Sequence, residues 1–120
     1  MKGQRKRVLI VDNDEDILIA LERLLETEGY DTVTAWSGQE AHLLLQAMEF
    51  DLVLMDDTLA DVSTDELITL IQRKLPSTPI IVLGSRGKEP AQVIAPLPRV
   101  RKWEHKEVAR AVAGHFSACA

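Results

Sequence analysis

The fold of this chain is set by FDLVLMDD, residues 50–57. The apolar run Leu52 to Met55 is too short for a buried helix and is typical of a strand covered on both faces. Two carboxylates, Asp56 and Asp57, follow at the carboxyl end of that strand. Binding sites in open parallel α/β sheets form at that edge. The stretch therefore predicts a central strand with an acidic site at its end.

A second buried strand, VLIV at residues 8–11, is also followed by acidic residues, DNDED at residues 12–16. If the two strands are neighbours, Asp12 and Asp56 meet in one crevice. Carboxylates crowded together repel one another unless a cation or a proton offsets the repulsion. We therefore expect a cation-dependent site between these two strand ends.

Strand and helix patterns alternate along the rest of the chain. Asp14 is placed to cap a helix, and SGQE at residues 37–40 and STDE at residues 63–66 are capping boxes. The other predicted elements are strands at 31–36, 80–83 and 97–100 and helices from Asp14 to Gly29, from Ser37 to Met48, from Ser63 to Pro76 and from Glu104 to Phe116. Residues 91–95 allow little more than one helical turn before the next proline.

This alternation predicts an α/β fold of the (βα)₅ type, with a shortened fourth helix. Helices then cover both faces of a doubly wound parallel sheet. Right-handed crossovers leave few strand orders, and we expect the flavodoxin-like order 2-1-3-4-5. That order makes the first and third strands neighbours, which brings Asp12 and Asp56 together.

Length and composition limit the function classes. We expect the 120 residues to form a single domain, with its core between about residues 7 and 116. No apolar run approaches the roughly 20 residues of a membrane span, and the lone Cys119 cannot form an internal disulfide, which fits the cytoplasm. The net charge of −5 argues against direct binding of nucleic acid.

Charge is unevenly distributed along the chain. Residues 8–79 hold sixteen of the nineteen acidic residues, whereas residues 86–110 hold seven basic residues against three acidic ones. We interpret the basic segment as a solvated helix face, and the alternative is a docking surface for an acidic partner.

The acidic residues suit phosphoryl chemistry. A carboxylate such as Asp56 can act as a nucleophile toward a phosphoryl group. Mg²⁺ would neutralise the phosphate and carboxylates together, and it takes only one or two carboxylates, here Asp12 and Asp56. The transferred group also needs donors and a positive charge on its far side, for which Ser85 and Lys102 are the candidates.

Residues 8–18 (VLIVDNDEDIL) and 51–56 (DLVLMD), with the spacing between them, resemble the opening and the phosphoacceptor strand of bacterial two-component response-regulator receiver domains. The resemblance implies a phosphorelay in which a histidine kinase or phosphotransfer protein phosphorylates Asp56 with Mg²⁺ bound. Signalling would then proceed by contact with a downstream protein target. The chain would not be an enzyme, beyond phosphorylating and dephosphorylating itself. A homodimer is left open, and membrane and nucleic-acid partners are not expected.

On the metal side, the resemblance carries over incompletely. It implies Asp12, Asn13, Asp56 and the backbone carbonyl of Thr58 as the Mg²⁺ ligands. The family usually has an acid where Asn13 stands. Because the amide removes one negative charge, we expect a weaker affinity for Mg²⁺.

The departures are larger from the fourth strand onward. Gly84 replaces the family's Thr or Ser, and Ser85 lies one residue late. Lys102 is the nearest match to the family's lysine on the fifth strand, with Arg101 as a rival, and that strand lacks the usual aromatic residue. The segment from Gly84 to Lys102 is also about four residues short, at the expense of the fourth helix.

Two other functions compete with the phosphorylated receiver. Asn13, Gly84 and the short fourth helix favour a pseudo-receiver, an interaction module without phosphoryl chemistry. A haloacid-dehalogenase-like phosphatase also places acids after a strand, but it needs a longer core and a lysine between its two motifs. Between Asp16 and Asp56 the only basic residue is Arg23.

Three further residues receive structural interpretations. We expect Asp57 to face away from the site and to be solvated. Trp36 and Trp103 are expected to be packing residues.

Overall fold

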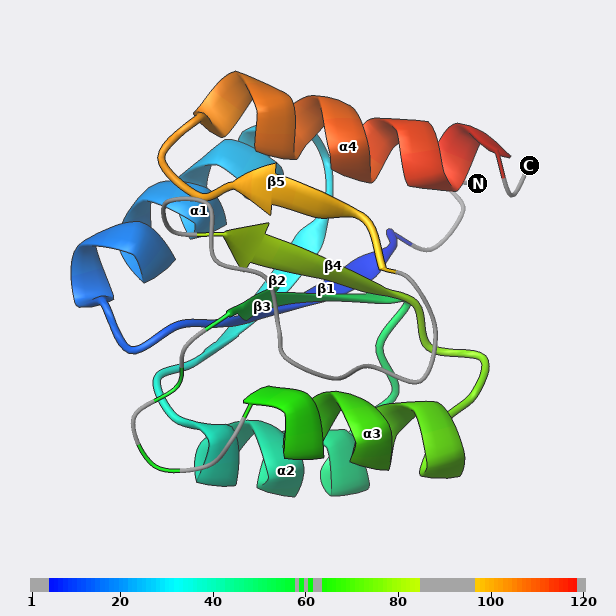
Figure 1. Ribbon diagram of the computed structural model, residues 1–120. Coiled ribbons are helices and arrows are strands. Elements are labelled where there is room, and N and C mark those ends of the chain that lie inside the picture. The colour runs from blue at the N-terminus through cyan, green and yellow to red at the C-terminus, as the bar shows by residue number, and fades with distance from the viewer. Residues whose placement is uncertain (1–4, 58, 60, 62–63, 85–96, 119–120) are drawn as a thin grey trace.

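The computed structural model describes residues 5–57, 59, 61, 64–84 and 97–118. Within them, five parallel strands form one sheet in the predicted order β2-β1-β3-β4-β5 (Figure 1). The strands are β1 (Arg7–Val11), β2 (Asp31–Ala35), β3 (Leu52–Asp56), β4 (Ile80–Gly84) and β5 (Arg99–Arg101). Because all five run in the same direction, their carboxyl ends lie at one edge of the sheet.

Helices cover both faces of the sheet. The described helices are α1 (Glu15–Thr27), α2 (Gly38–Ala47), α3 (Thr64–Lys74) and α4 (His105–Ala118). Figure 1 shows α1 and α4 on one face and α2 and α3 on the other. This is the doubly wound arrangement that the alternating pattern predicted.

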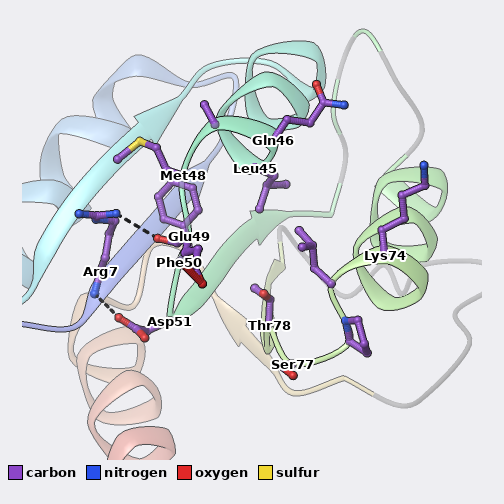
Figure 2. Close-up of a pocket in the computed structure, with 13 residues that line it drawn as sticks. Arg7, Leu45, Gln46, Met48, Glu49, Phe50, Asp51, Lys74, Ser77 and Thr78 are labelled. Carbon is purple, nitrogen blue, oxygen red and sulfur yellow. Dashed lines mark hydrogen bonds between the residues drawn. The ribbon is translucent and has the colours of Figure 1, made fainter.

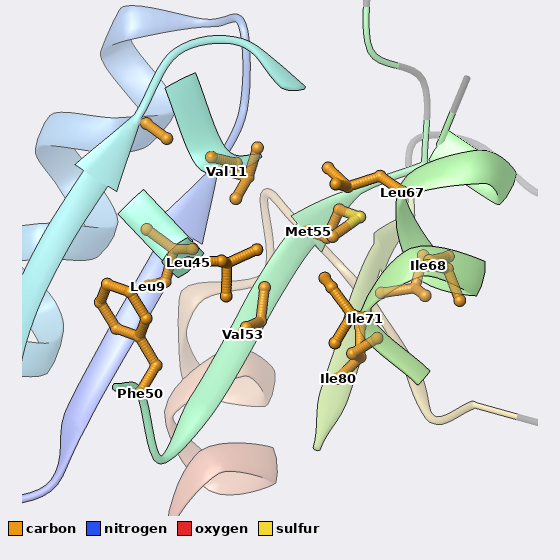
Figure 3. Packing of buried hydrophobic residues seen from close by; sticks show 13 residues of the cluster. Leu9, Val11, Leu45, Phe50, Val53, Met55, Leu67, Ile68, Ile71 and Ile80 are labelled. Atoms are coloured by element: carbon orange, nitrogen blue, oxygen red, sulfur yellow. The ribbon is translucent and has the colours of Figure 1, made fainter. Parts of the chain in front are cut away.

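The central strand β3 is buried on both sides. Val53 and Met55 pack in a cluster with side chains from α2 and α3 (Figure 3). Leu52 and Leu54 alternate to the opposite face and pack with side chains from α1 and α4. All four side chains have no exposed surface, so the apolar run does form a strand covered on both faces.

Side-chain caps fix where α1 and α2 begin. The Asp14 carboxylate accepts hydrogen bonds from the backbone N–H groups of Asp16 and Ile17. The Ser37 hydroxyl accepts from the Glu40 N–H at 3.0 Å, as the capping box predicted. The Glu40 carboxylate accepts from the Trp36 N–H at 2.9 Å, one residue before the position expected in a capping box. These caps fix the turns that follow β1 and β2.

The fifth strand is displaced from its predicted range. It spans Arg99–Arg101 rather than residues 97–100. The Pro98 carbonyl accepts from the Val82 N–H at 2.9 Å, but proline has no N–H with which to continue the ladder. The short helical turn predicted at residues 91–95 lies outside the described residues.

The interpretation of both tryptophans as packing residues is wrong. Trp36 is 69% exposed and Trp103 is 62% exposed. Trp36 directly follows β2 and Trp103 lies two residues beyond β5, and these are the two edge strands. Beyond the end of an edge strand there is little sheet surface against which a large side chain can pack.

Candidate functional site

The ends of β1 and β3 bring the two predicted carboxylates together. Val11 lies beside Met55 in the parallel register, so Asp12 and Asp56 are the next residues on neighbouring strands. Both residues have no exposed surface. The Asp12 N–H donates to the Ala35 carbonyl at 3.1 Å, which also ties this end of β1 to β2.

Lys102 joins the two carboxylates. Its Nζ lies 3.4 Å from Oδ2 of Asp12 and 3.4 Å from Oδ1 of Asp56. The backbone places this lysine at the edge of the sheet, because the Lys102 N–H donates to the Gly84 carbonyl at 3.2 Å. A single ammonium group therefore serves two buried acids that lie at the ends of two other strands, β1 and β3.

Arg101, the rival for this position, points elsewhere. Its side chain is 70% exposed and pairs with the Glu107 carboxylate at 2.8 Å. Successive side chains of a strand leave opposite faces, so at the end of β5 only one of the two bases can reach the carboxylates. The sequence did not decide whether Lys102 or Arg101 takes the place of the family's lysine on the fifth strand. In the structure, Lys102 is the one that contacts Asp12 and Asp56.

Burial and crowding shift the protonation of all three groups. Burial raises the pKa of Asp56 to about 6, repulsion from Asp12 adds to the shift, and the Lys102 ammonium opposes it. Burial also raises the pKa of Asp12, against the hydrogen bond from the Asp14 N–H. For Lys102 burial acts to lower the pKa, but attraction to the two carboxylates outweighs it and the pKa is raised. The site therefore favours any additional positive charge.

One carboxylate oxygen is available to such a charge. Oδ1 of Asp12 accepts from the Asp14 N–H at 2.9 Å. Oδ2 of Asp56, in contrast, is buried and has no hydrogen-bond partner among the described residues. A buried anionic oxygen without a partner is costly, and a bound cation or a proton relieves that cost.

The donor set fits Mg²⁺ better than a transition metal. No group of three His, Cys, Asp or Glu side chains is arranged to hold a metal ion in the part of the chain that the structure describes. Two carboxylates are nevertheless enough for Mg²⁺, which keeps several waters and takes oxygen ligands. Asn13, the third predicted ligand, is exposed beside Asp12. Thr58, the fourth, lies outside the described residues.

Asp57 is not solvated, and this expectation from the sequence is wrong. Its side chain is only 2% exposed and pairs with Nη2 of Arg99 at 3.1 Å. The partner lies 42 residues further along the chain, which is why local sequence did not reveal it. The only sequence feature that pointed to this ion pair was Arg99 itself, a charged residue within a weak strand pattern. The sequence therefore did not predict that Arg99 would reach this edge of the sheet.

The side chain of Thr64 contacts the backbone at the end of β3. Its hydroxyl donates to the Asp56 carbonyl at 3.3 Å and accepts from the Leu59 N–H at 3.2 Å. The sequence reading assigned Thr64 only to the capping box at residues 63–66, whose Ser63 lies outside the described residues. Ser85, the predicted hydroxyl donor, also lies outside them.

Asp61 links the loop after β3 to α2. Its carboxylate accepts from the N–H groups of Gly38 and Gln39 at 2.9 and 3.0 Å. An anion at a helix N-terminus is favourable because the free N–H groups and the helix dipole both point at it. Asp61 is therefore anchored at the start of α2.

A cavity of about 890 Å³ lies away from these residues, at the amino-terminal edge of the sheet (Figure 2). It is lined by residues around Arg7, Asp51 and Ser77. Arg7 donates there through its backbone N–H to the Asp51 carboxylate at 2.8 Å. Neither Asp12 nor Asp56 lines it, so the chemistry of the carboxylates belongs to the opposite edge.

Comparison with known proteins identifies the class. The response regulator receiver domain family matches residues 8–97. The chain is 35% identical over 95 residues to the transcriptional regulatory protein GlrR of Escherichia coli, covering 79% of this chain and 21% of GlrR. It is 31% identical over 84 residues to the transcriptional regulatory protein PhoP of Bacillus subtilis, covering 70% of this chain and 35% of PhoP. The chain therefore belongs to the response regulator receiver domain family.

A solved structure agrees with this assignment. The response regulator protein TrrA of Thermotoga maritima, crystallised in complex with Mg(2+)-BeF, superposes with a TM-score of 0.82 at 28% identity. The match covers 91% of this chain and 97% of TrrA. As a member of this family the chain is a receiver of phosphorelay signal transduction, and the phosphatase alternative gains no support. No described helix is both long enough and apolar enough to span a membrane.

Proposed function

We propose that Asp56 is the phosphoacceptor of this receiver and that Asp12 and Lys102 complete its site. The observation that carries the proposal is the state of the Asp56 carboxylate. It is fully buried, one oxygen lies 3.4 Å from Nζ of Lys102, and the other has no partner among the described residues. A nucleophile needs such an oxygen with a free lone pair, together with a nearby positive charge.

In the proposed reaction a carboxylate oxygen of Asp56 attacks the phosphorus of a phosphohistidine. The new bond joins that oxygen to phosphorus, and the bond between phosphorus and the imidazole nitrogen breaks. The electron pair of the broken bond stays on that nitrogen, and because the other ring nitrogen carries a proton, the histidine leaves as a neutral imidazole. Lys102 attracts the incoming anion, because its ammonium lies 3.4 Å from Oδ1 of Asp56.

Asp12, Asn13, Asp56 and the backbone carbonyl of Thr58 are the proposed residues that would hold Mg²⁺. When bound, the ion would supply positive charge to offset the phosphate and the two carboxylates together. The two buried carboxylates of Asp12 and Asp56, which share one ammonium, fit this role. Support also comes from TrrA, which was crystallised in complex with Mg(2+)-BeF.

The proposed partners follow from the relatives. The chain spans about a fifth of GlrR and about a third of PhoP, so their whole activities do not transfer to it. We propose a histidine kinase or phosphotransfer protein upstream and a protein target downstream, in the cytoplasm. Direct contact with nucleic acid is not part of the proposal, since the net charge is −5.

The second candidate function is the pseudo-receiver. Asn13 and Gly84 favour it, because one removes a charge from the metal side and the other removes a hydroxyl from the phosphoryl side. This module would use the same fold without accepting phosphate, and neither function makes the chain an enzyme acting on other substrates.

Labelling with a small-molecule phosphodonor in the presence of Mg²⁺ separates these functions. We expect intact-mass measurement to show a gain of one phosphoryl group. Asp56→Asn should abolish the gain. Asp51→Asn, at the other end of the β3 region, should retain it, because Asp51 contacts the Arg7 N–H at the opposite edge. An unlabelled wild-type chain would contradict the proposal and leave the pseudo-receiver.

A further inference from the structure

Arg99 extends from β5 across β4 to the end of β3. Its Nη2 lies 3.1 Å from Oδ2 of Asp57, directly after the proposed acceptor. The Arg99 side chain is only 23% exposed. Arg99 is beside Val82 in the sheet register, and Val82 belongs to the cluster under α2 and α3. The guanidinium therefore rises along that face to the carboxyl edge of the sheet.

Gly84 makes this path possible. A Cβ on Gly84 would lie 3.2 Å from Nη2 of Arg99, tighter than an ordinary van der Waals contact. The guanidinium thus occupies the space in which a side chain at residue 84 would begin. Gly84 also contacts the backbone of Lys102, because the Lys102 N–H donates to the Gly84 carbonyl at 3.2 Å. The Asp57 N–H donates to the Leu83 carbonyl at 3.1 Å, which ties Asp57 to β4.

Negative charge at this edge of the sheet exceeds what the Lys102 ammonium alone can neutralise. Three buried carboxylates, Asp12, Asp56 and Asp57, lie at neighbouring strand ends. The Lys102 ammonium is already shared by two of them. A phosphoryl group on Asp56 adds negative charge and three acceptor oxygens, more than one ammonium can satisfy. Guanidinium presents several donors in a planar fork and binds phosphate readily.

We propose that Arg99 is a second phosphoryl ligand of this site. When Asp56 carries a phosphoryl group, the guanidinium exchanges Asp57 for a phosphoryl oxygen and so supplies the donor that Gly84 cannot. The exchange breaks and makes only hydrogen bonds and ion pairs. It couples the state of Asp56 to β5, the strand on which Arg99 and Arg101 lie. The proposal depends on the proposed function of Asp56.

Binding of beryllofluoride, a phosphoryl mimic, at saturating Mg²⁺ tests this role. We expect Arg99→Gln to raise its dissociation constant about tenfold or more, because a charged hydrogen bond is lost. The matched control is Arg101→Gln on the same strand, where the side chain is 70% exposed. The control should change the constant by less than about twofold, because exposed ion pairs contribute little.

Measuring Arg99→Gln in a chain that already carries Asp57→Asn distinguishes two roles of Arg99: binding the phosphoryl group, or only holding Asp57 in place. If Arg99 binds the phosphoryl group, Arg99→Gln still weakens beryllofluoride binding about tenfold in a chain that already carries Asp57→Asn. If Arg99 only holds Asp57, the second substitution has no effect there, and that result would overturn the proposal. Thermal unfolding of each variant, without ligand, reports the loss of the ion pair itself.

Two further outcomes are decisive. Should Arg99→Gln fail to fold, Asp57→Asn alone decides: removing the carboxylate that pairs with Nη2 of Arg99 must tighten beryllofluoride binding, and unchanged or weaker binding would overturn the role of Arg99. A wild-type chain that neither binds beryllofluoride nor gains a phosphoryl group would instead refute the proposed function of Asp56, and the role of Arg99 would be refuted with it.

Discussion

The two halves of the sheet's carboxyl edge are built on different principles. At the ends of β1 and β3, short acidic side chains are fully buried and share one ammonium. At the ends of β4 and β5, a glycine leaves space that a long arginine fills from the side. The first half concentrates negative charge, which in the proposed function serves a cation and a phosphoryl group. The second half has no hydroxyl at residue 84, and a guanidinium from β5 lies close to that residue instead.

Removing Lys102 should break the acidic half and have the largest effect. Lys102→Met leaves two buried carboxylates without their counter-ion, so we expect a loss of about 3 kcal/mol in the free energy of unfolding at pH 8. The loss should shrink toward pH 5, because the carboxylates then take up protons. Urea unfolding at both pH values measures this. Arg101→Met, on an exposed arginine, should cost less than about 1 kcal/mol, and equal costs for the two variants would contradict the account.

Removing the charge of Asp56 should stabilise the fold in the absence of metal. The pKa of Asp56 is raised to about 6, so the folded chain binds a proton that the unfolded chain has already released between about pH 4 and pH 6. Stability from this group therefore falls as pH rises through that window.

Asp56→Asn removes this dependence and should raise the free energy of unfolding at pH 8 by roughly 1–3 kcal/mol, with little change at pH 4. Chelator-treated protein and thermal unfolding at the two pH values provide the measurement. The control Asp51→Asn should not stabilise the fold. A destabilised Asp56→Asn chain at pH 8 would show that the carboxylates do not repel one another.

Placing an acid at residue 13 should strengthen the binding of Mg²⁺ if Asn13 is a ligand, as proposed. Asn13→Asp adds a charged oxygen beside Asp12, and we expect Mg²⁺ to bind about tenfold more tightly because affinity follows the charge of the ligands. Calorimetric titration of the metal measures the change. Asn13→Ala keeps the charge of the wild type and should not tighten binding; if Asn13→Asp does not tighten it either, residue 13 is not a ligand.

Adding a methyl group at residue 84 should have the smallest effect. The nearest atom to the new Cβ is the far end of the Arg99 side chain, which can move aside. We expect Gly84→Ala to change the free energy of unfolding by less than about 1 kcal/mol. The neighbouring Leu83 has no exposed surface, and Leu83→Ala should cost about 2–5 kcal/mol. A cost for Gly84→Ala as large as that of Leu83→Ala would mean that Arg99 is locked rather than adaptable.

Sequence predicted the acidic half well because its signals are local. Apolar runs mark β1 and β3, and the strand order 2-1-3-4-5, one of the few that right-handed crossovers leave, makes these strands neighbours. Asp12 and Asp56 directly follow those runs, so their proximity followed from that order. The strand order and the caps at Asp14 and Ser37 were accessible in the same way.

The other half could not be derived from local patterns. Whether Lys102 or Arg101 reaches the carboxylates depends on which face each side chain leaves, and a strand of three residues gives too little alternation to decide. The burial of Asp57 depends on an arginine 42 residues away. The range of β5 also shifted, because Pro98 cannot continue the ladder of hydrogen bonds.

A crystal structure of the chain with Mg²⁺ and beryllofluoride would show directly whether Asp12, Asp56 and Lys102 form the proposed phosphoacceptor site. We expect beryllium attached to a carboxylate oxygen of Asp56, Mg²⁺ in contact with Asp12 and Asp56, and a fluoride beside Nζ of Lys102. Beryllofluoride bound to another residue, or Mg²⁺ bound without Asp12 or Asp56 among its ligands, would contradict the account.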